Sequence, residues 1–259
     1  RWDISSDCGV KSNKLIKRKR ASKMRILSGS KVNFNQDILW ETPQDDIDLH
    51  EVKQLPNGNY MGFIPVIEEH PVPTYTDYPG ERDSSFSWEE DFEEDTTWDW
   101  KGEKIVEWDK DTKEVVWEWN VFDYYSLDDF DYLAGHWEKA KRDNLSYDWI
   151  HFNALAFSES ENALYVSSRH LDRITKIDYN SKEIIWNMGL QWYGDTVIPF
   201  DDFISGQHGL QILPNGNIVT LDNGLHSQIY ISGLSTSISR ALEINVSVGN
   251  GQYTATTVW

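Results

Sequence analysis

Hydrophobic and polar residues alternate over short segments of this chain, a pattern that predicts β-strands. The clearest segment, 151–157, places its side chains alternately on two faces, and a polar turn at 158–162 follows it. Further strands are expected at 163–169, 173–178 and 183–188. No long stretch has helical periodicity, and one short loop helix is expected at 137–142. The pattern therefore predicts an all-β chain.

One motif recurs three times, and each copy begins with a histidine. His50 begins His-Glu-Val-Lys-Gln-Leu-Pro-Asn-Gly-Asn, and His208 begins His-Gly-Leu-Gln-Ile-Leu-Pro-Asn-Gly-Asn. His151 begins a segment of the same layout with a different turn. A radially repeated fold carries equivalent positions to equivalent places around an axis. We therefore expect the three histidine side chains to converge.

A second repeat ends on tryptophan and sets the length of the repeating unit. The segment Asp-Lys-Asp-Thr-Lys-Glu-Val-Val before Trp117 closely matches Asp-Tyr-Asn-Ser-Lys-Glu-Ile-Ile before Trp186, and weaker copies end at Trp40 and Trp259. The four tryptophans lie 77, 69 and 73 residues apart, which suits four-stranded blades with long inserted loops. The sequence thus predicts a single β-propeller domain over residues 1–259.

The two repeats also predict blade boundaries. The expected units are a partial first blade at 1–46, a blade at 47–119 with an acidic insertion at 81–99, and blades at 148–188 and 205–259. About four blades or fewer fit into 259 residues, whereas propellers close with ~4–8. We expect a fragment truncated at both ends, which would leave a sheet edge open and fold poorly alone.

Composition narrows the class of partner. The formal charge of −19 argues against a nucleic acid or an anionic membrane surface as the ligand. Much of that charge lies in the insertion at 81–99, which we expect to be a solvated loop. No run of 18 apolar residues exists, so no membrane span is expected. The single cysteine, Cys8, offers no intrachain disulfide and no partner for a cysteine metal site.

Strand pairing adds an arginine to the histidines. If the polar turn is as expected, Arg169 lies directly across from His151, with Cβ atoms about 5 Å apart. The same arithmetic places Asp222 or Asn223 opposite His208. Arginine offers a fixed fork of donors, and histidine can donate, accept or attack. Three imidazoles and one guanidinium at a channel mouth therefore suit a tetrahedral anion.

Four short motifs resemble, in this order, those of the bacterial arylsulfotransferases, the aryl-sulfate sulfotransferases that work without adenylyl sulfate. They are Asp148-Trp149-Ile150-His151-Phe152-Asn153, Ser167-Ser168-Arg169-His170, Gly206-Gln207-His208 and Leu221-Asp222-Asn223-Gly224. His50-Glu51 followed by Leu-Pro-Asn-Gly fits the first channel histidine of that family. The resemblance runs from about Asp46 to Asn250 and implies a six-bladed propeller. The acidic insertion is not part of the matched pattern.

The resemblance also implies a reaction and a role for each site residue. A sulfuryl group would pass from an aryl sulfate ester to a phenolic acceptor by a ping-pong route. His208 would be the nucleophile that becomes sulfohistidine, while His50, His151 and Arg169 would bind the sulfuryl oxygens. Substrate contacts would come from Asn153, His170, Asp222 and Asn223.

The same resemblance implies no metal and no organic cofactor. The partners would be a small aryl sulfate donor and a phenolic acceptor, and not a nucleic acid. Members of the family are exported, so a periplasmic or extracellular location is implied. A homodimer stays open as the oligomeric state.

Other interpretations of the same residues also stay open. His50, His151 and His208 could bind a metal as three imidazoles, although Arg169 would repel a dication there. The propeller could be a non-catalytic scaffold or sensor that only binds an anion. The tryptophan repeat is also similar to that of quinoprotein dehydrogenases, but no acidic ligand set for their calcium appears in the channel strands.

Overall fold

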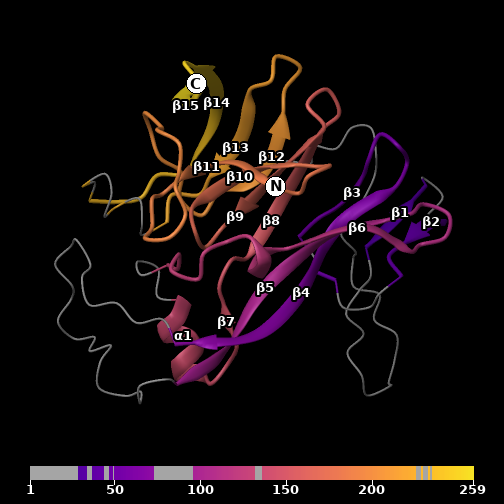
Figure 1. The fold of residues 1–259 in the computed structure, drawn as a ribbon, viewed down its shortest axis with the longest axis horizontal. Helices are drawn as coiled ribbons and strands as arrows, with labels where there is room; N and C mark the ends of the chain where they lie inside the picture. Colours follow the sequence, from indigo (N-terminus) through magenta and orange to yellow (C-terminus); the bar gives the residue numbers. More distant parts are fainter. Residues whose placement is uncertain are drawn as a thin grey trace.

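Three four-stranded antiparallel sheets make up most of the described chain (Figure 1). The first consists of β3 (Val52–Gln54), β4 (Tyr60–Pro71), β5 (Thr97–Trp108) and β6 (Val115–Asn120), with β7 (Tyr147–Asp148) added beside β5. The second consists of β8 (Phe152–Ser158), β9 (Ala163–Ser168), β10 (Arg173–Asp178) and β11 (Ile184–Gly189). The third consists of β12 (His208–Ile212), β13 (Ile218–Asp222), β14 (Arg240–Gly249) and β15 (Gln252–Thr257). This computed structural model describes residues 29–33, 37–43, 47–48, 50–72, 96–131, 136–225, 229, 233 and 235–259.

The first strands of the three sheets are connected by the side chains of β3 and the residue before it. The Lys53 ammonium donates to the main-chain oxygens of Leu155 in β8 and Leu210 in β12. The Glu51 carboxylate pairs with Lys53 at 3.0 Å and accepts the Leu155 amide at 2.6 Å. Strands β3, β8 and β12 thus lie together, as the inner strands of propeller blades do. The prediction of an all-β chain built from four-stranded blades agrees with this arrangement.

The blade boundaries stay a prediction, and the structure differs from the expectation for the acidic insertion at one place. The three sheets span residues 52–120, 152–189 and 208–257, and a two-stranded sheet of β1 (Ser30–Val32) and β2 (Ile38–Glu41) comes before them. Residues 97–99 are not loop, because they extend β5 and pair with the end of β4. The core side of this extension is aromatic: the Trp100 ring packs edge to face against Tyr147 and Trp149. The remainder of the predicted insertion up to residue 95 lies outside the described residues, as do residues 1–28.

The tryptophan repeat marks the outermost strands and the turns before them. Asp109 and Asp178 each accept two backbone amides from the turn that follows, as aspartates do at the start of tight turns. The next strands carry Trp117 in β6 and Trp186 in β11, both buried. Trp117 stacks on Tyr179 at 5.3 Å and donates its indole N–H to the Tyr179 main-chain oxygen at 2.8 Å. The repeated segment therefore joins one sheet to the next.

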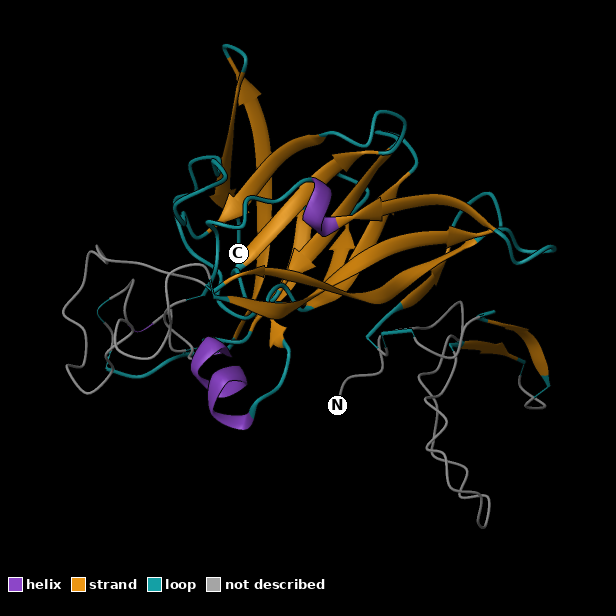
Figure 2. Cartoon of the chain, turned by 60° about the horizontal axis from the view of Figure 1, so that its bottom comes forward, coloured by secondary structure: helices purple, strands orange, loops and turns teal. Residues whose placement is uncertain are grey.

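The helices that the structure describes in full are short and come between strands in the order of the chain, and α1 lies beside the sheets (Figure 2). They are η1 (Val121–Asp123) and α1 (His136–Asp143), the second of which includes the loop helix predicted at 137–142. Trp137 anchors α1, with its ring buried against Trp98 and Tyr147. In the described part of the chain, no helix has the length and apolar character needed to cross a membrane.

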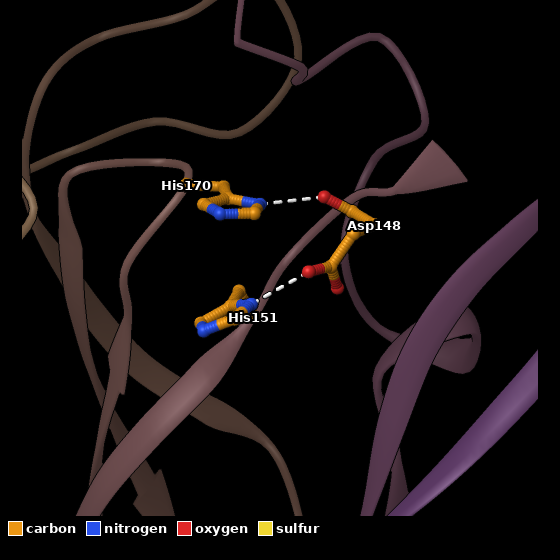
Figure 3. A group of neighbouring side chains, drawn as sticks. All are labelled: Asp148, His151 and His170. Atoms are coloured by element: carbon orange, nitrogen blue, oxygen red, sulfur yellow. Dashed lines mark hydrogen bonds and ion pairs between the residues drawn. The ribbon is translucent and has the colours of Figure 1, made fainter. Parts of the chain in front are cut away.

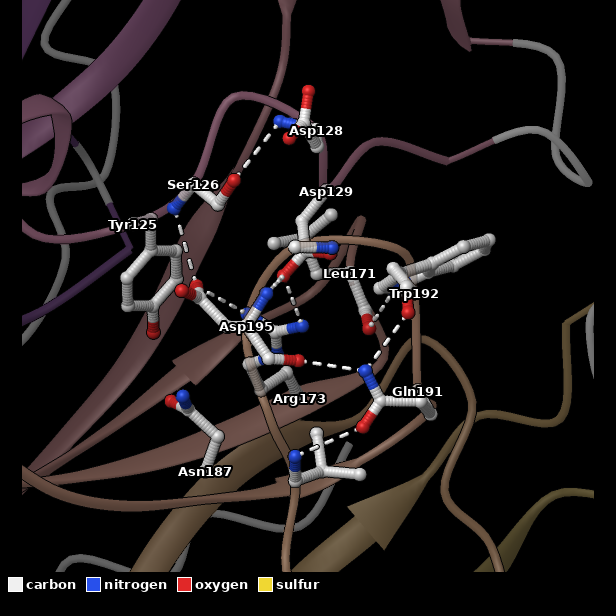
Figure 4. Close-up of polar contacts among 12 residues, drawn as sticks. Tyr125, Ser126, Asp128, Asp129, Leu171, Arg173, Asn187, Gln191, Trp192 and Asp195 are labelled. Carbon is white, nitrogen blue, oxygen red and sulfur yellow. Dashed lines mark hydrogen bonds and ion pairs between the residues drawn. The ribbon is translucent and has the colours of Figure 1, made fainter. Parts of the chain in front are cut away.

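A buried arginine ties two loops to the start of β10 (Figure 4). Arg173 is fully buried and donates to Asp129, itself fully buried, at 2.6 Å and to Asp195 at 3.1 Å. Asp129 also accepts the backbone amides of Gly194 and Asp195. The guanidinium lies 5.4 Å from the centre of the Tyr125 ring. The loop after β6 and the loop after β11 are thus held together through one cation.

Candidate active site

Three histidines stand where the first strand of each sheet begins. His50 precedes β3, His151 precedes β8, and His208 is the first residue of β12. The rings of His50 and His151 meet edge to face with centroids 4.8 Å apart. Both residues, together with Arg169, act electrostatically on His208. The structure therefore brings together the positions that the repeat singles out.

A β-bulge sets the register that faces Arg169 toward His151. Ser158, not Phe157, pairs with Ala163, so the turn is one residue shorter than predicted. A bulge between Phe152 and Ala154 compensates for this shift, and the Arg169 amide donates to the His151 main-chain oxygen at 3.2 Å. The expected pair is therefore formed by a different register. His151 has a φ of 55°, in the left-handed region that non-glycine residues rarely adopt.

A second bulge changes the partner of His208. The backbone of His208 pairs with Leu221, and not with Asp222 or Asn223 as predicted. The register shifts directly after His208, where Gly209 has a φ of 64°. Glycine adopts this conformation without the steric cost that a Cβ would bring.

Each of these histidines directs its Nδ1 atom at an oxygen. His50 contacts the Asp48 carboxylate, His151 contacts the Asp148 carboxylate at 2.6 Å, and His208 contacts the Gly206 main-chain oxygen at 2.8 Å. A carbonyl or an ionised carboxylate only accepts hydrogen bonds, so these contacts place the proton on Nδ1. At His208 the Asn223 amide nitrogen, 3.0 Å from the same Nδ1, then does not donate to it. No described residue forms a hydrogen bond with Nε2 of any of the three rings, so these atoms can take part in chemistry.

Electrostatics keeps the His208 ring uncharged. Burial lowers the pKa of His208, and electrostatic interactions with Arg169, His50 and His151 lower it further, against the opposing hydrogen bond to Gly206. A neutral imidazole with its proton on Nδ1 has a lone pair on Nε2. His208 therefore has the form that a nucleophile requires.

Two further imidazoles continue the row behind His151. His170 stacks on His151 with ring centroids 4.5 Å apart, and His136 of α1 stacks on His170 at 3.5 Å. His170 is buried and donates Nδ1–H to the Asp148 main-chain oxygen at 2.5 Å, next to the carboxylate contact of His151 (Figure 3). Burial lowers the pKa of His136 to about 4 and places that of His170 well below its ordinary value. Both rings are therefore uncharged at neutral pH.

Asp148, His151 and His170 also have the composition of a metal site. One potential ligand atom from each lies within 4.8 Å of the others, and this is the grouping found among the described residues. It differs from the three-histidine set of the metal interpretation, since neither His50 nor His208 belongs to it. Both Nδ1 atoms already face oxygens of Asp148. The contacts therefore fit a hydrogen-bonded cluster that orients two imidazoles.

Asn153 is held by the segment before His208. It is buried and donates its amide to the Gln207 main-chain oxygen at 2.7 Å. Gln207 is fully buried, and its own amide donates to Ser167 at 2.9 Å and to the Arg173 main-chain oxygen at 2.9 Å. These bonds join the second and third sheets next to His208. A direct contact from Asn153 to substrate stays a prediction.

Asn223 and Asp222 differ in where their side chains lie. The Asn223 amide lies 3.0 Å from His208 Nδ1. Asp222 is fully buried, accepts the Ser205 amide at 2.9 Å and binds Arg240 at 3.0 Å. Asn223 therefore adjoins the nucleophile candidate, whereas the Asp222 carboxylate supports the loops of the third sheet.

The acidic partners of His50 and His151 could not be recognised from the repeats in the sequence. Asp48 lies two residues before His50 and Asp148 three residues before His151, while His208 has Gly206 in that place. Because the spacing between the acid and the histidine differs from copy to copy, alignment of the repeats does not reveal the acids. His136 was missed because it lies on a helix outside the repeats, and nothing in its own segment marks it.

The chain is similar to a known family of proteins over much of its length. A family model described as Arylsulfotransferase (ASST) matches residues 84–259, which include His151, Arg169 and His208 and leave His50 outside. No curated protein matches the chain. The matched region is well over half of the sequence, and it contains the second and third sheets entire. The chain belongs to the arylsulfotransferase family.

Proposed function

We propose that this protein moves a sulfuryl group from an aryl sulfate to a phenolic acceptor through a sulfohistidine at His208. Membership of the family implies aryl sulfotransferase activity and small-molecule substrates. The observation that carries the proposal is the contact of His208 Nδ1 with the Gly206 main-chain oxygen, which leaves Nε2 unprotonated. Arg169, His50 and His151 also interact electrostatically with this ring.

The reaction would run in two displacements. Nε2 of His208 attacks the sulfur, the bond from sulfur to the aryl oxygen breaks, and the phenolate leaves with the electron pair. Arg169, His50 and His151 would stabilise the oxygens of the sulfuryl group as it transfers. In the second displacement the acceptor phenol loses its proton to a neighbouring imidazole, its oxygen attacks sulfur, and the nitrogen–sulfur bond breaks.

An assay with a chromogenic donor tests this function. Purified protein incubated with 4-nitrophenyl sulfate and phenol is expected to release 4-nitrophenol at a rate that depends on phenol, and to form phenyl sulfate. Donor alone is expected to add the mass of one sulfuryl group to the intact protein. Release that ignores added phenol would identify a hydrolase. Binding of the donor with neither release nor adduct would identify an anion-binding scaffold.

The pH dependence of the first displacement follows from the state of His208. Protonation of Nε2 removes the nucleophile, and the pKa of His208 lies below its ordinary value because of burial and of Arg169, His50 and His151. The rate of the first phenol burst is therefore expected to be flat through neutral pH. It falls about tenfold per unit only below the lowered pKa.

An Arg169→Gln variant is expected to move this acid limb to higher pH, because one of the charges that lower the pKa is gone. Stopped-flow measurement of the burst at saturating donor checks the shift. An acid limb that stays in place, or moves to lower pH, would contradict the electrostatic role of Arg169.

The six-blade count and export to the periplasm or the cell exterior stay predictions. Both the blade number and the location are implied by the resemblance of the sequence motifs to the arylsulfotransferases. Cell fractionation of the native host decides the second.

A further inference from the structure

Lys101 lies behind both aspartate–histidine pairs. Strand β7 runs parallel to β5 with Asp148 opposite Lys101, and the Trp149 amide donates to the Lys101 main-chain oxygen at 3.0 Å. Its ammonium is 3.4 Å from the Asp148 carboxylate and 3.7 Å from that of Glu103. Asp48 is within electrostatic reach of the same ammonium. One cation thus faces the acceptors of both His50 and His151.

Three acids surround this ammonium, and we call Asp48, Glu103 and Asp148 the carboxylate cluster. Burial raises the pKa of Glu103 to about 8; Lys101 opposes this rise, and Asp148 and Asp48 add to it. Glu103 is therefore mostly neutral at neutral pH. Like charges at this spacing cannot all ionise without a compensating cation.

The two aspartates of the cluster remain ionised. Burial opposes ionisation of Asp148, yet the hydrogen bond from His151 and the electrostatic interactions with His170, His151 and Lys101 hold its pKa well below the usual range. Burial also opposes ionisation of Asp48, whose pKa is nevertheless lowered by its bonds to His50 and by Lys101. For Lys101, burial lowers the pKa, but Asp148, Glu103 and Asp48 together raise it above its ordinary value.

We propose that Lys101 is a positioning residue for sulfuryl transfer: its ammonium, 3.4 Å from the Asp148 carboxylate, holds that carboxylate where it accepts from Nδ1 of His151, which leaves Nε2 of His151 toward the substrate. The proposal rests on the proposed function of the site. A carboxylate that turns away from the ring no longer accepts from Nδ1, and the imidazole can then carry its proton on either nitrogen. Loss of the carboxylate acceptor behind a catalytic histidine lowers kcat by about 10⁴-fold in serine proteases. Lys101 contacts the carboxylate and not the histidine itself.

The test compares Lys101→Met with Lys101→Arg and with Lys104→Met. Lys104 lies on the same strand, has the same side-chain exposure of 28%, and pairs with Glu118 at 3.2 Å outside the carboxylate cluster. For transfer, kcat of Lys101→Met is expected to fall about 10- to 100-fold, as for other outer-shell partners of functional histidines. KM for the donor is expected to stay within about twofold, because Lys101 does not touch the substrate. Lys101→Arg should restore most of kcat, and Lys104→Met should match wild type.

The second readout needs no turnover. In histidine-labelled protein above neutral pH, the nitrogen chemical shifts of His50 and His151 are expected to report the Nδ1–H tautomer in wild type, Lys101→Arg and Lys104→Met. In Lys101→Met a mixture with the Nε2–H tautomer is expected at His151. The tautomer of each ring also depends on the other groups that face it. For His50 these are Asp48, Glu51, His151 and His208, and for His151 they are Asp148, His50, His136, His170 and His208.

The two readouts separate failure of the inference from failure of the function. Unchanged tautomers in Lys101→Met would overturn the role of Lys101, whatever the enzyme does. A wild-type protein that shows the expected tautomers and no transfer would overturn the proposed function alone. A fall in kcat of equal size in Lys104→Met would show a general effect of strand β5 and would also overturn the proposal.

Discussion

A His208→Asn variant is expected to lose sulfuryl transfer by roughly 10⁴- to 10⁶-fold, the loss seen when a covalent nucleophile is removed from an enzyme. The asparagine amide keeps a donor near the position of Nδ1, which bonds to Gly206, and removes the Nε2 atom. The surrounding loop should therefore keep its conformation while the reacting atom is absent. Phenol release measured by absorbance, and intact mass after incubation with donor alone, check the result.

The matched control for this variant is His70→Asn. His70 lies on β4, packs against Phe122 at 4.9 Å and pairs with Glu68 at 3.3 Å. It tests whether loss of any half-buried histidine lowers activity, and its transfer rate is expected to stay within about twofold of wild type. A sulfuryl adduct of normal yield on His208→Asn would assign the covalent step to another residue, with His50 and His151 the next candidates.

An Arg173→Met variant is expected to lower the free energy of unfolding by about 3–5 kcal/mol, because it leaves the buried Asp129 carboxylate without its cation. Asp129 and Arg173 are both fully buried, so solvent cannot replace the lost partner. The loops after β6 and β11, which the ion pair joins, should loosen first. Urea denaturation followed by tryptophan fluorescence measures the change.

Arg142→Met provides the comparison for this stability prediction. Arg142 is 69% exposed and pairs with Asp143 at 3.0 Å on the surface of α1. Exposed pairs of this kind contribute about 0–1 kcal/mol. A loss below about 1 kcal/mol in Arg173→Met would mean that water reaches Asp129 and that the cluster is not closed.

Repetition made much of the fold predictable from the sequence. The segment from His151 onward alternates cleanly, and its four strands lie within about a residue of the expected positions. The aspartate turns before Trp117 and Trp186 could be matched because each needs the same side chain at the same place. A side chain needed at the same place in two sheets therefore leaves a readable signal.

What could not be predicted depends on unequal or long-range contacts. The bulges at Asn153 and Gly209 shift the register by one residue, and no local residue pattern distinguishes a bulge from a one-residue change in turn length. The contact of Lys101 with Asp148 depends on a parallel strand pair between β5 and β7, which lie far apart in the sequence. His136 enters the site from a helix that belongs to no repeat.

The left-handed backbone of His151 has a consequence for how this site can change by mutation. Its φ of 55° is tolerated by glycine, asparagine and aspartate, but costs most other residues about 1–2 kcal/mol. An alanine scan would therefore combine backbone strain with the loss of the imidazole and overstate the chemical contribution of His151. In evolution, few single substitutions at this position keep the loop intact, so loss of the histidine is expected to pass through asparagine, aspartate or glycine.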